Sequence, residues 1–175
     1  IGHLAKSLLS KKLLKFVSIH ALNSKGVIKN INLKKKISNF SNDYNYIFLL
    51  IRPKTFLTSG NQFQKYLSKE TLVISCMAGI KLSTIEKTLK SKKIVRIMPN
   101  VMALNNKSQT HIYIKNKNLF DSKLKKILST FGKIINVRNE DQINFATSVF
   151  GSGPAFIAYI VNIFVKASKK LAKPY

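Results

Sequence analysis

The chain has 175 residues, of which 45% are apolar, so it can build one ordinary domain with a buried core and is not a disordered polymer. Its formal net charge is +25, a value typical of proteins that bind nucleic acid or anionic membranes. However, its positive residues are nearly all Lys, the exceptions being Arg52, Arg96 and Arg138, and they are scattered along the chain. Nucleic-acid interfaces favour Arg. We therefore attribute the charge to A/T-rich codons, which enrich Lys, Asn, Ile and Phe together, and expect no nucleic-acid partner.

The single cysteine, Cys76, excludes an internal disulfide and favours the reducing cytoplasm. The three histidines are not spaced as metal ligands, so we expect no metal. The chain does not start with Met, and its first residues lack the layout of a signal peptide.

Apolar runs alternate with amphipathic segments along most of the chain. The runs that predict strands are 13–21, 44–53, 71–79, 93–100, 111–116 and 133–138. Helical spacing of apolar residues predicts helices at 4–12, 59–68, 81–91 and 120–132. In the last of these, Leu124, Ile127, Leu128 and Phe131 share one face, and Gly132 suits the stop after the helix. This alternation predicts an α/β fold with a Rossmann-like, mostly parallel sheet up to Arg138.

Beyond Arg138 the pattern is helical only. Asn139 is a plausible N-cap, and the sequence "FGSGPAF" (150–156) predicts a join between two helices or a sharp kink in one. No charged residue occurs from 143 to 165, a stretch long enough to cross a bilayer. The Gly and Pro residues inside it favour a buried helix pair in a soluble protein instead, so we expect no membrane partner.

Ligands of an open parallel sheet bind at the carboxyl ends of its strands. Those ends fall at 23–25, 51–53, 76–79 and 98–100, where the residues are small, polar or backbone-restricting. The first of these ends carries no acid to hold the 2′-hydroxyl of NADH, so a dinucleotide bound there would be NADPH, with NADH also possible.

Three strings, "SCMAGIKLSTIEKTL" (75–89), "RIMPN" (96–100) and "EDQINFATSVFGSGPAF" (140–156), resemble the pyrroline-5-carboxylate reductase family in order and spacing. The resemblance implies NAD(P)H-dependent reduction of the small-molecule imine 1-pyrroline-5-carboxylate to L-proline, in proline biosynthesis. It also implies a dinucleotide-binding domain at 1–138 that lacks its first strand and first glycines. The start of an all-α dimerisation domain would follow at 139–175, which makes the intact family homo-oligomeric.

Carried over by position, the resemblance implies a set of contacts. The implied coenzyme contacts are Gly2, Asn23, Ser24, Leu50, Ile51, Arg52, Pro53, Cys76, Met77, Ala78 and Glu140. The implied substrate contacts are Asn100 and Ser152, with a helix–helix turn free of ligand contact as the alternative for Ser152. Arg52 stands where the family has a lysine, and Cys76 is expected to pack rather than react.

This sequence departs from the family pattern at positions that the family uses for coenzyme binding and catalysis. The glycines that open the phosphate loop and the downstream threonine loop are not among these residues, so the catalytic group is unknown. Val101 and Met102 replace a Thr-Pro pair, and Asn162 replaces an acid. We expect residues 1–175 alone to be catalytically inactive and, with their last helices uncovered, to associate. The alternative is a non-catalytic relic or nucleotide-binding fragment, which the flanking gene sequence would distinguish; a nucleic-acid binder would show salt-sensitive DNA affinity.

Overall fold

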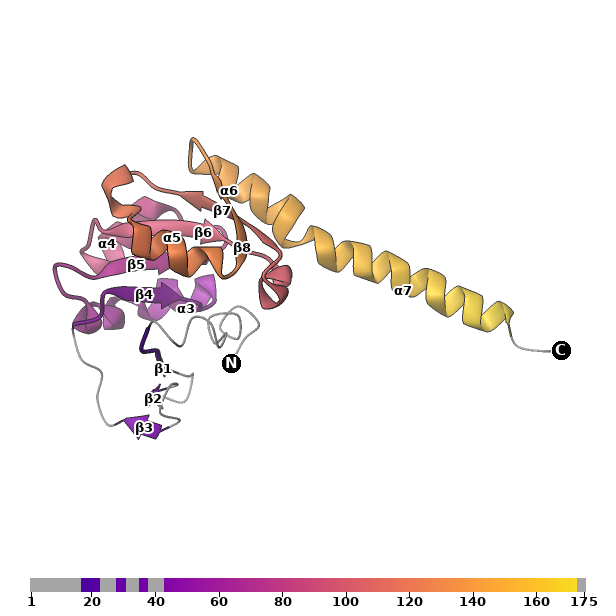
Figure 1. Cartoon of the computed structure of the whole chain (residues 1–175), viewed down its shortest axis with the longest axis horizontal. Helices are drawn as coiled ribbons and strands as arrows, with labels where there is room; N and C mark the ends of the chain where they lie inside the picture. The colour runs from indigo at the N-terminus through magenta and orange to yellow at the C-terminus, as the bar shows by residue number, and fades with distance from the viewer. Residues whose placement is uncertain (1–16, 23–27, 31–34, 38–42, 173–175) are drawn as a thin grey trace.

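The computed structural model describes residues 17–22, 28–30, 35–37 and 43–172. The predicted helix at 4–12 and the predicted contacts Gly2, Asn23 and Ser24 lie outside the described residues. The strands form two sheets (Figure 1). The smaller, antiparallel sheet comprises β1 (His20–Leu22), β2 (Ile28–Asn30) and β3 (Lys35–Ile37). The larger sheet comprises β4 (Tyr46–Leu49), β5 (Leu72–Ser75), β6 (Ile94–Met98), β7 (Ser108–Tyr113) and β8 (Gly132–Asn136), in that order.

The prediction of one strand over 13–21 is confirmed only at its end, where His20 and Ala21 belong to β1. Residues 17–19 have no regular structure, and β1 pairs with β2 in the smaller sheet. Val17 and Ile19 nevertheless pack against the core of the larger sheet. The apolar side chains Val17 and Ile19 are thus partly buried by packing, without joining the parallel ladder.

The larger sheet is mostly parallel, as predicted. β4, β5 and β6 run parallel, β7 is antiparallel to β6, and β8 is parallel to β7. The reversal at β7 follows from the short connection, residues 99–107, because a parallel crossover needs roughly a dozen residues or more. The carboxyl ends of β4, β5 and β6 therefore share one edge with the amino ends of β7 and β8.

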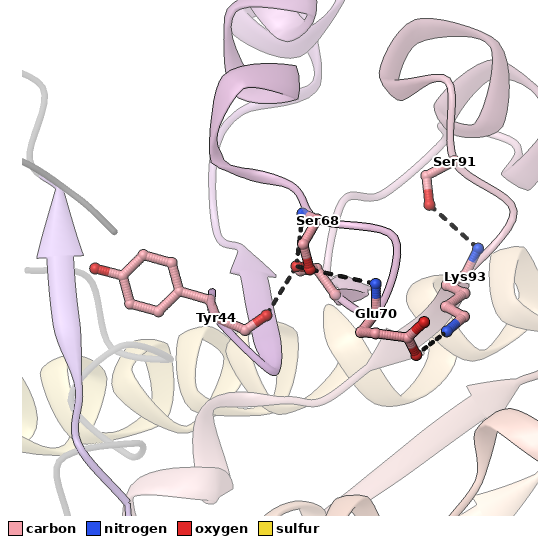
Figure 2. A network of polar contacts seen from close by, with 6 residues as sticks. Tyr44, Ser68, Glu70, Ser91 and Lys93 are labelled. Atoms are coloured by element: carbon pink, nitrogen blue, oxygen red, sulfur yellow. Dashed lines mark hydrogen bonds and ion pairs between the residues drawn. The ribbon is translucent and has the colours of Figure 1, made fainter. Parts of the chain in front are cut away.

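A polar network at the opposite edge joins the amino ends of β4, β5 and β6 (Figure 2). The Thr71 hydroxyl donates to the Tyr44 carbonyl at 2.8 Å and accepts from the Ser68 N–H at 3.0 Å. Glu70 pairs with Lys93 at 2.6 Å, and the Lys93 N–H donates to the Ser91 hydroxyl at 3.2 Å. Because Glu70 is well exposed, we ascribe the order of these turns to the buried Thr71 contacts rather than to the ion pair.

Helices lie between the strands and after them. They are α3 (Pro53–Ser59), η1 (Gly60–Tyr66), α4 (Leu82–Leu89), η2 (Val101–Asn105), η3 (Lys117–Leu119), α5 (Ser122–Ser129), α6 (Asp141–Ala146), η4 (Thr147–Gly151) and α7 (Gly153–Leu171). The helix predicted over 59–68 starts earlier, at Pro53, and continues as the 3₁₀ segment η1. Pro53 suits the first helical turn because its missing N–H has no partner there.

Two hydrophobic clusters cover the two faces of the larger sheet. One contains Ile74, Val95 and the buried face of α5, and the other contains Val73, Ile94 and the buried faces of α3 and α4. Alternate residues of β5 and β6 thus enter opposite clusters, as a central strand requires. This is the Rossmann-like layering that the sequence predicts.

The predicted apolar face of α5 is confirmed, because Leu124, Ile127, Leu128 and Phe131 are all buried. The function assigned to Gly132 was wrong, since α5 ends at Ser129 and Gly132 is the first residue of β8. Its φ is +134°, and a Cβ there would lie 2.4 Å from the Ser108 carbonyl oxygen. Glycine is needed because β7 approaches closely.

The predicted capping by Asn139 is confirmed by its hydrogen bonds, although the regular helix α6 begins at Asp141, with Glu140 directly before it. The Gln142 N–H donates to Asn139 Oδ1 at 3.1 Å, and Gln142 Oε1 accepts from the Asn139 N–H at 3.3 Å. This reciprocal pair is a capping box. As predicted, the "FGSGPAF" stretch joins two helices. The π-type turn η4 follows α6, the Ser152 N–H donates to the Thr147 carbonyl at 3.0 Å, and α7 begins at Gly153.

The expectation of a buried helix pair over 143–165 was wrong for α7. This helix projects away from the sheet and has no buried residue (Figure 1). Among the described residues, one helical stretch, Asp141–Leu171, is long and apolar enough to cross a membrane by length and composition alone, with a mean hydropathy of 1.6.

Candidate functional site

The candidate site is the edge where β4, β5 and β6 end. The Cys76 N–H donates to the Leu49 carbonyl at 3.2 Å, so the segments after β4 and β5 leave the sheet side by side. β6 pairs with β5 on its other side. The structure therefore brings the predicted segments 50–53, 76–79 and 98–100 to one edge, while their roles in binding stay predictions.

After β4, the chain carries two half-buried apolar side chains, Leu50 and Ile51, followed by the exposed cation Arg52. Leu50 and Ile51 pack against the two clusters on opposite faces of the sheet. Arg52 has an extended backbone and its carbonyl accepts from the Phe56 N–H at 3.1 Å, so it caps α3. Its side chain is exposed and makes no ion pair with the described residues. A free guanidinium at this edge fits an anionic ligand.

After β5, the chain makes a tight, partly buried turn. The Ser75 hydroxyl accepts from the Met77 N–H at 3.3 Å, and Met77 is buried. Burial raises the pKa of the Cys76 thiol, which favours its protonated form, and the half-buried side chain packs against one hydrophobic cluster. Its lack of reactivity stays a prediction. Gly79 has a φ of +71°, and no atom lies within 4 Å of the place where its Cβ would be. The turn has open space beside its backbone, which suits close approach of a ligand.

After β6, Asn100 makes hydrogen bonds within the loop to which it belongs. Its side chain accepts from the Met102 N–H at 3.1 Å, and its N–H donates to the Ser108 hydroxyl at 3.1 Å. The Ser108 hydroxyl in turn lies 3.0 Å from that of Thr110. These bonds order the connection between β6 and β7.

The turn η4 lies near the same edge. A Cβ on Gly151 would lie 4.0 Å from the Met98 sulfur, and Met98 is the last residue of β6. Phe150 packs on the His111 ring with the two centroids 4.7 Å apart. Ser152 is half-buried, and its carbonyl accepts from the Ala155 and Phe156 N–H groups. The predicted substrate contact is thus close to the edge, on a turn that packing holds.

Sequence reasoning missed Arg96. This residue is only 1% exposed, and its Nη1 lies 2.5 Å from Oε1 of Glu140, 44 residues away. The same carboxylate oxygen accepts from the Leu82 N–H at 2.5 Å. Glu140, predicted as a coenzyme contact, therefore already has two protein partners. A charged residue inside the apolar run 93–100 was the available signal, because a buried charge needs a partner.

Two surface depressions are lined mainly by other residues. One of about 270 Å³ is lined by residues of β7, β8 and α6, with His111 and Phe150 among them. Another of about 360 Å³ lies around β7, η3 and β8. Neither is lined by a predicted contact. In the part of the chain that the structure describes, no three His, Cys, Asp or Glu side chains come together as a metal site would need.

Comparisons with known proteins give consistent results. No family model matches the chain. A pyrroline-5-carboxylate reductase of Staphylococcus aureus (strain COL) is 35% identical over 134 residues, which are 74% of this chain and 48% of that protein. One from Staphylococcus epidermidis is 33% identical over the same length. The chain spans about half the length of the curated relatives that it matches.

Solved structures agree. The crystal structure of Plasmodium falciparum pyrroline carboxylate reductase with NADP bound matches 74% of this chain and 50% of its own, with a TM-score of 0.63 and 26% identity. A 1-pyrroline-5-carboxylate reductase from Streptococcus pyogenes matches 76% of this chain and 51% of its own, with a TM-score of 0.62 and 26% identity.

Proposed function

We propose that this chain, a member of the pyrroline-5-carboxylate reductase family over the region that aligns, supplies the coenzyme-binding part of an enzyme that reduces 1-pyrroline-5-carboxylate to L-proline with NADPH. The observation that supports this most is the shared edge. The segments 50–53, 76–79 and 98–100 are distant in sequence and adjacent in the sheet. An open parallel sheet binds dinucleotides at this edge.

The residues at this edge fit a reduced nicotinamide coenzyme. Its chemistry is the donation of a hydride, which requires exclusion of water and fixed geometry. The half-buried Cys76 thiol adds apolar surface at this edge, and the open backbone at Gly79 leaves room beside it. Arg52 offers a positive charge to the phosphates or to the carboxylate of the imine.

We assign 1–138 to the coenzyme-binding domain and 139–175 to the start of a helical domain. The change from strand–helix alternation to helices alone, after β8, supports this boundary. As in the family pattern, we expect a homo-oligomer in the cytoplasm, with no nucleic-acid or membrane partner. The catalytic acid is not assigned to any of these residues.

The first test is titration of the purified chain with NADPH, followed by coenzyme fluorescence. We expect saturable binding that Arg52→Glu weakens about tenfold, equal to about 1.4 kcal/mol. Lys123→Glu is the matched control, because it makes the same charge change on the exposed side of α5. Absence of binding, or equal weakening by both variants, would contradict the proposal.

Coenzyme preference and turnover are further tests. We expect NADPH to bind more tightly than NADH, and Asn23→Asp to reduce that difference, because the family resemblance assigns Asn23 to the adenosine ribose, where an acid selects the 2′-hydroxyl. Residues 1–175 alone should show no imine-dependent oxidation of NADPH, because they hold no counterpart of the family's threonine loop. Clear turnover would refute this expectation.

A further inference from the structure

One buried ion pair connects three parts of the candidate site. Arg96 lies within β6, paired in register with Ser75 of β5 and Tyr113 of β7. Its partner Glu140 directly precedes α6 and has 22% of its side chain exposed. The pair therefore ties the centre of the sheet to the start of the C-terminal helices.

The same pair contacts both ends of the turn between β5 and α4. Arg96 Nη2 lies 3.5 Å from the Met77 carbonyl oxygen, and Glu140 Oε1 accepts from the Leu82 N–H at 2.5 Å. Between these two contacts lie residues 78–81, which include Ala78 and Gly79. The turn that carries predicted coenzyme contacts is therefore held at both of its ends by one guanidinium–carboxylate pair.

Glu140 also substitutes for a missing cap on α4. The N-cap residue of α4, Lys81, makes no side-chain cap bond, so the first N–H groups of the helix need another acceptor. The Glu140 carboxylate provides it for Leu82, and its negative charge is favourable at a helix N-terminus. The start of α4 is thus fixed by a residue that lies 58 positions later in the chain.

Stability alone is a poor reason for this arrangement. Burying a guanidinium is costly, and a buried ion pair is often no more stable than apolar residues of the same volume. Arg96 Nε adds to this cost, because it is buried and has no hydrogen-bond partner among the described residues. What the pair offers that apolar side chains do not is directional contact to the Met77 carbonyl and the Leu82 amide.

We propose that Arg96 and Glu140 are positioning residues that hold the 77–82 turn in its coenzyme-binding shape and lock it to α6. On this account Glu140 acts through the turn and does not itself touch the coenzyme. The effect on coenzyme binding rests on the function proposed above, whereas the effect on the turn does not.

The experiment combines hydrogen exchange with NADPH titration on the full chain. Glu140→Ala removes both contacts of the carboxylate, whereas Glu140→Gln keeps an oxygen that can accept from the Leu82 N–H. Arg96→Lys keeps the positive charge but loses the planar guanidinium that contacts both Glu140 and the Met77 carbonyl. Asp141→Asn is the matched control, because it neutralises the neighbouring exposed acid in the first turn of α6.

We expect exchange in a peptide covering 77–82 to rise at least tenfold in Glu140→Ala and Arg96→Lys, and less in Glu140→Gln. Exchange in β7 and β8 and in Asp141→Asn should stay unchanged, and the Kd for NADPH should rise about tenfold in the two stronger variants. If Glu140→Ala or Arg96→Lys does not fold, Glu140→Gln still tests the proposal, because its exchange should rise at 77–82 and not in β7 or β8.

Unchanged exchange at 77–82, or an equal rise throughout the sheet, would overturn the proposal, because a merely stabilising pair acts globally. If the wild-type chain does not bind NADPH, the proposed function fails while the exchange result still decides the positioning of the turn. Selective loosening with an unaltered Kd would overturn the coenzyme part alone.

Discussion

The large sheet and α7 contrast sharply within one chain. Every residue of β5 and β6 is buried, whereas α7 buries none, with Phe156, Tyr159 and Phe164 each at least 65% exposed. Both regions are strongly apolar in sequence. The difference is that the sheet finds its covering layers, α3, α4 and α5, in the same chain. A helix that is apolar on most of its surface is stable only where something else covers it.

The polar residues of α7 underline this contrast. Lys166, Lys169 and Lys170 all fall in its last turns, and the preceding part of the helix carries no charge. Burial of apolar surface is favourable by about 25 cal/mol per Å². We therefore expect the apolar surface of α7 to pack against another apolar surface that is not part of the fold described here.

The largest expected effect is on association. The full chain should sediment as associated species, and Ile160→Glu combined with Phe164→Glu should shift it to monomer by removing the apolar surface. Leu57→Glu, a change at an exposed leucine of α3, is the control and should leave association unchanged. If the unaltered chain sediments as a single monomeric species, the apolar surface of α7 does not drive association.

The second effect separates the two regions by stability. Phe131→Ala should lower the free energy of unfolding of the sheet by about 3–5 kcal/mol, because it leaves a cavity beneath α5. Phe164→Ala, the same change in α7, should alter it by less than about 0.5 kcal/mol. Urea unfolding followed by circular dichroism measures both, and similar losses would show that α7 is packed against the sheet.

The third effect compares two glycines. Gly132→Ala should destabilise the chain by about 1–3 kcal/mol, because its φ is positive and β7 leaves no room for a Cβ. Gly153→Ala is the matched control in the first turn of α7, where nothing lies within 4 Å of a Cβ. Urea midpoints that move equally would contradict the close approach between β7 and β8.

The smallest effect is a dependence on pH. Burial lowers the pKa of His111 below its usual value of about 6.5. At a pH between the lowered and the usual pKa, His111 is protonated in the unfolded chain and neutral in the folded chain. Stability should therefore be unaffected by this group above about pH 6.5 and fall as the pH drops below it. Urea midpoints at pH 7.5 and 5.5 should differ more for the wild type than for His111→Gln; an equal difference would contradict this.

Much of the fold was predictable because the central strands are short apolar runs that end in Pro or Gly. The strands within 71–79 and 93–100 are confirmed for that reason, and the helix face from Leu124 to Phe131 is confirmed because its apolar residues recur at helical spacing. The reversal at β7 was not predictable from periodicity, because alternation carries no information on strand direction. The length of the 99–107 connection was the usable signal.

The candidate site was predictable only in part. The strand pattern predicts that 50–53, 76–79 and 98–100 lie at one edge of the sheet, because parallel strands end at the same edge. The Arg96–Glu140 pair was not foreseen, since the pattern of one strand cannot name a partner at the start of a distant helix. The exposure of α7 was foreseen only where the family pattern was considered, because a helix this apolar is normally buried.

Hydrogen exchange of the full chain with and without saturating NADPH tests the central claim most directly. We expect slower exchange in peptides covering 50–53, 76–79 and 98–100, with β7, β8 and α5 unchanged. Slower exchange confined to the depression around His111 and Phe150, or none at these three segments, would contradict it.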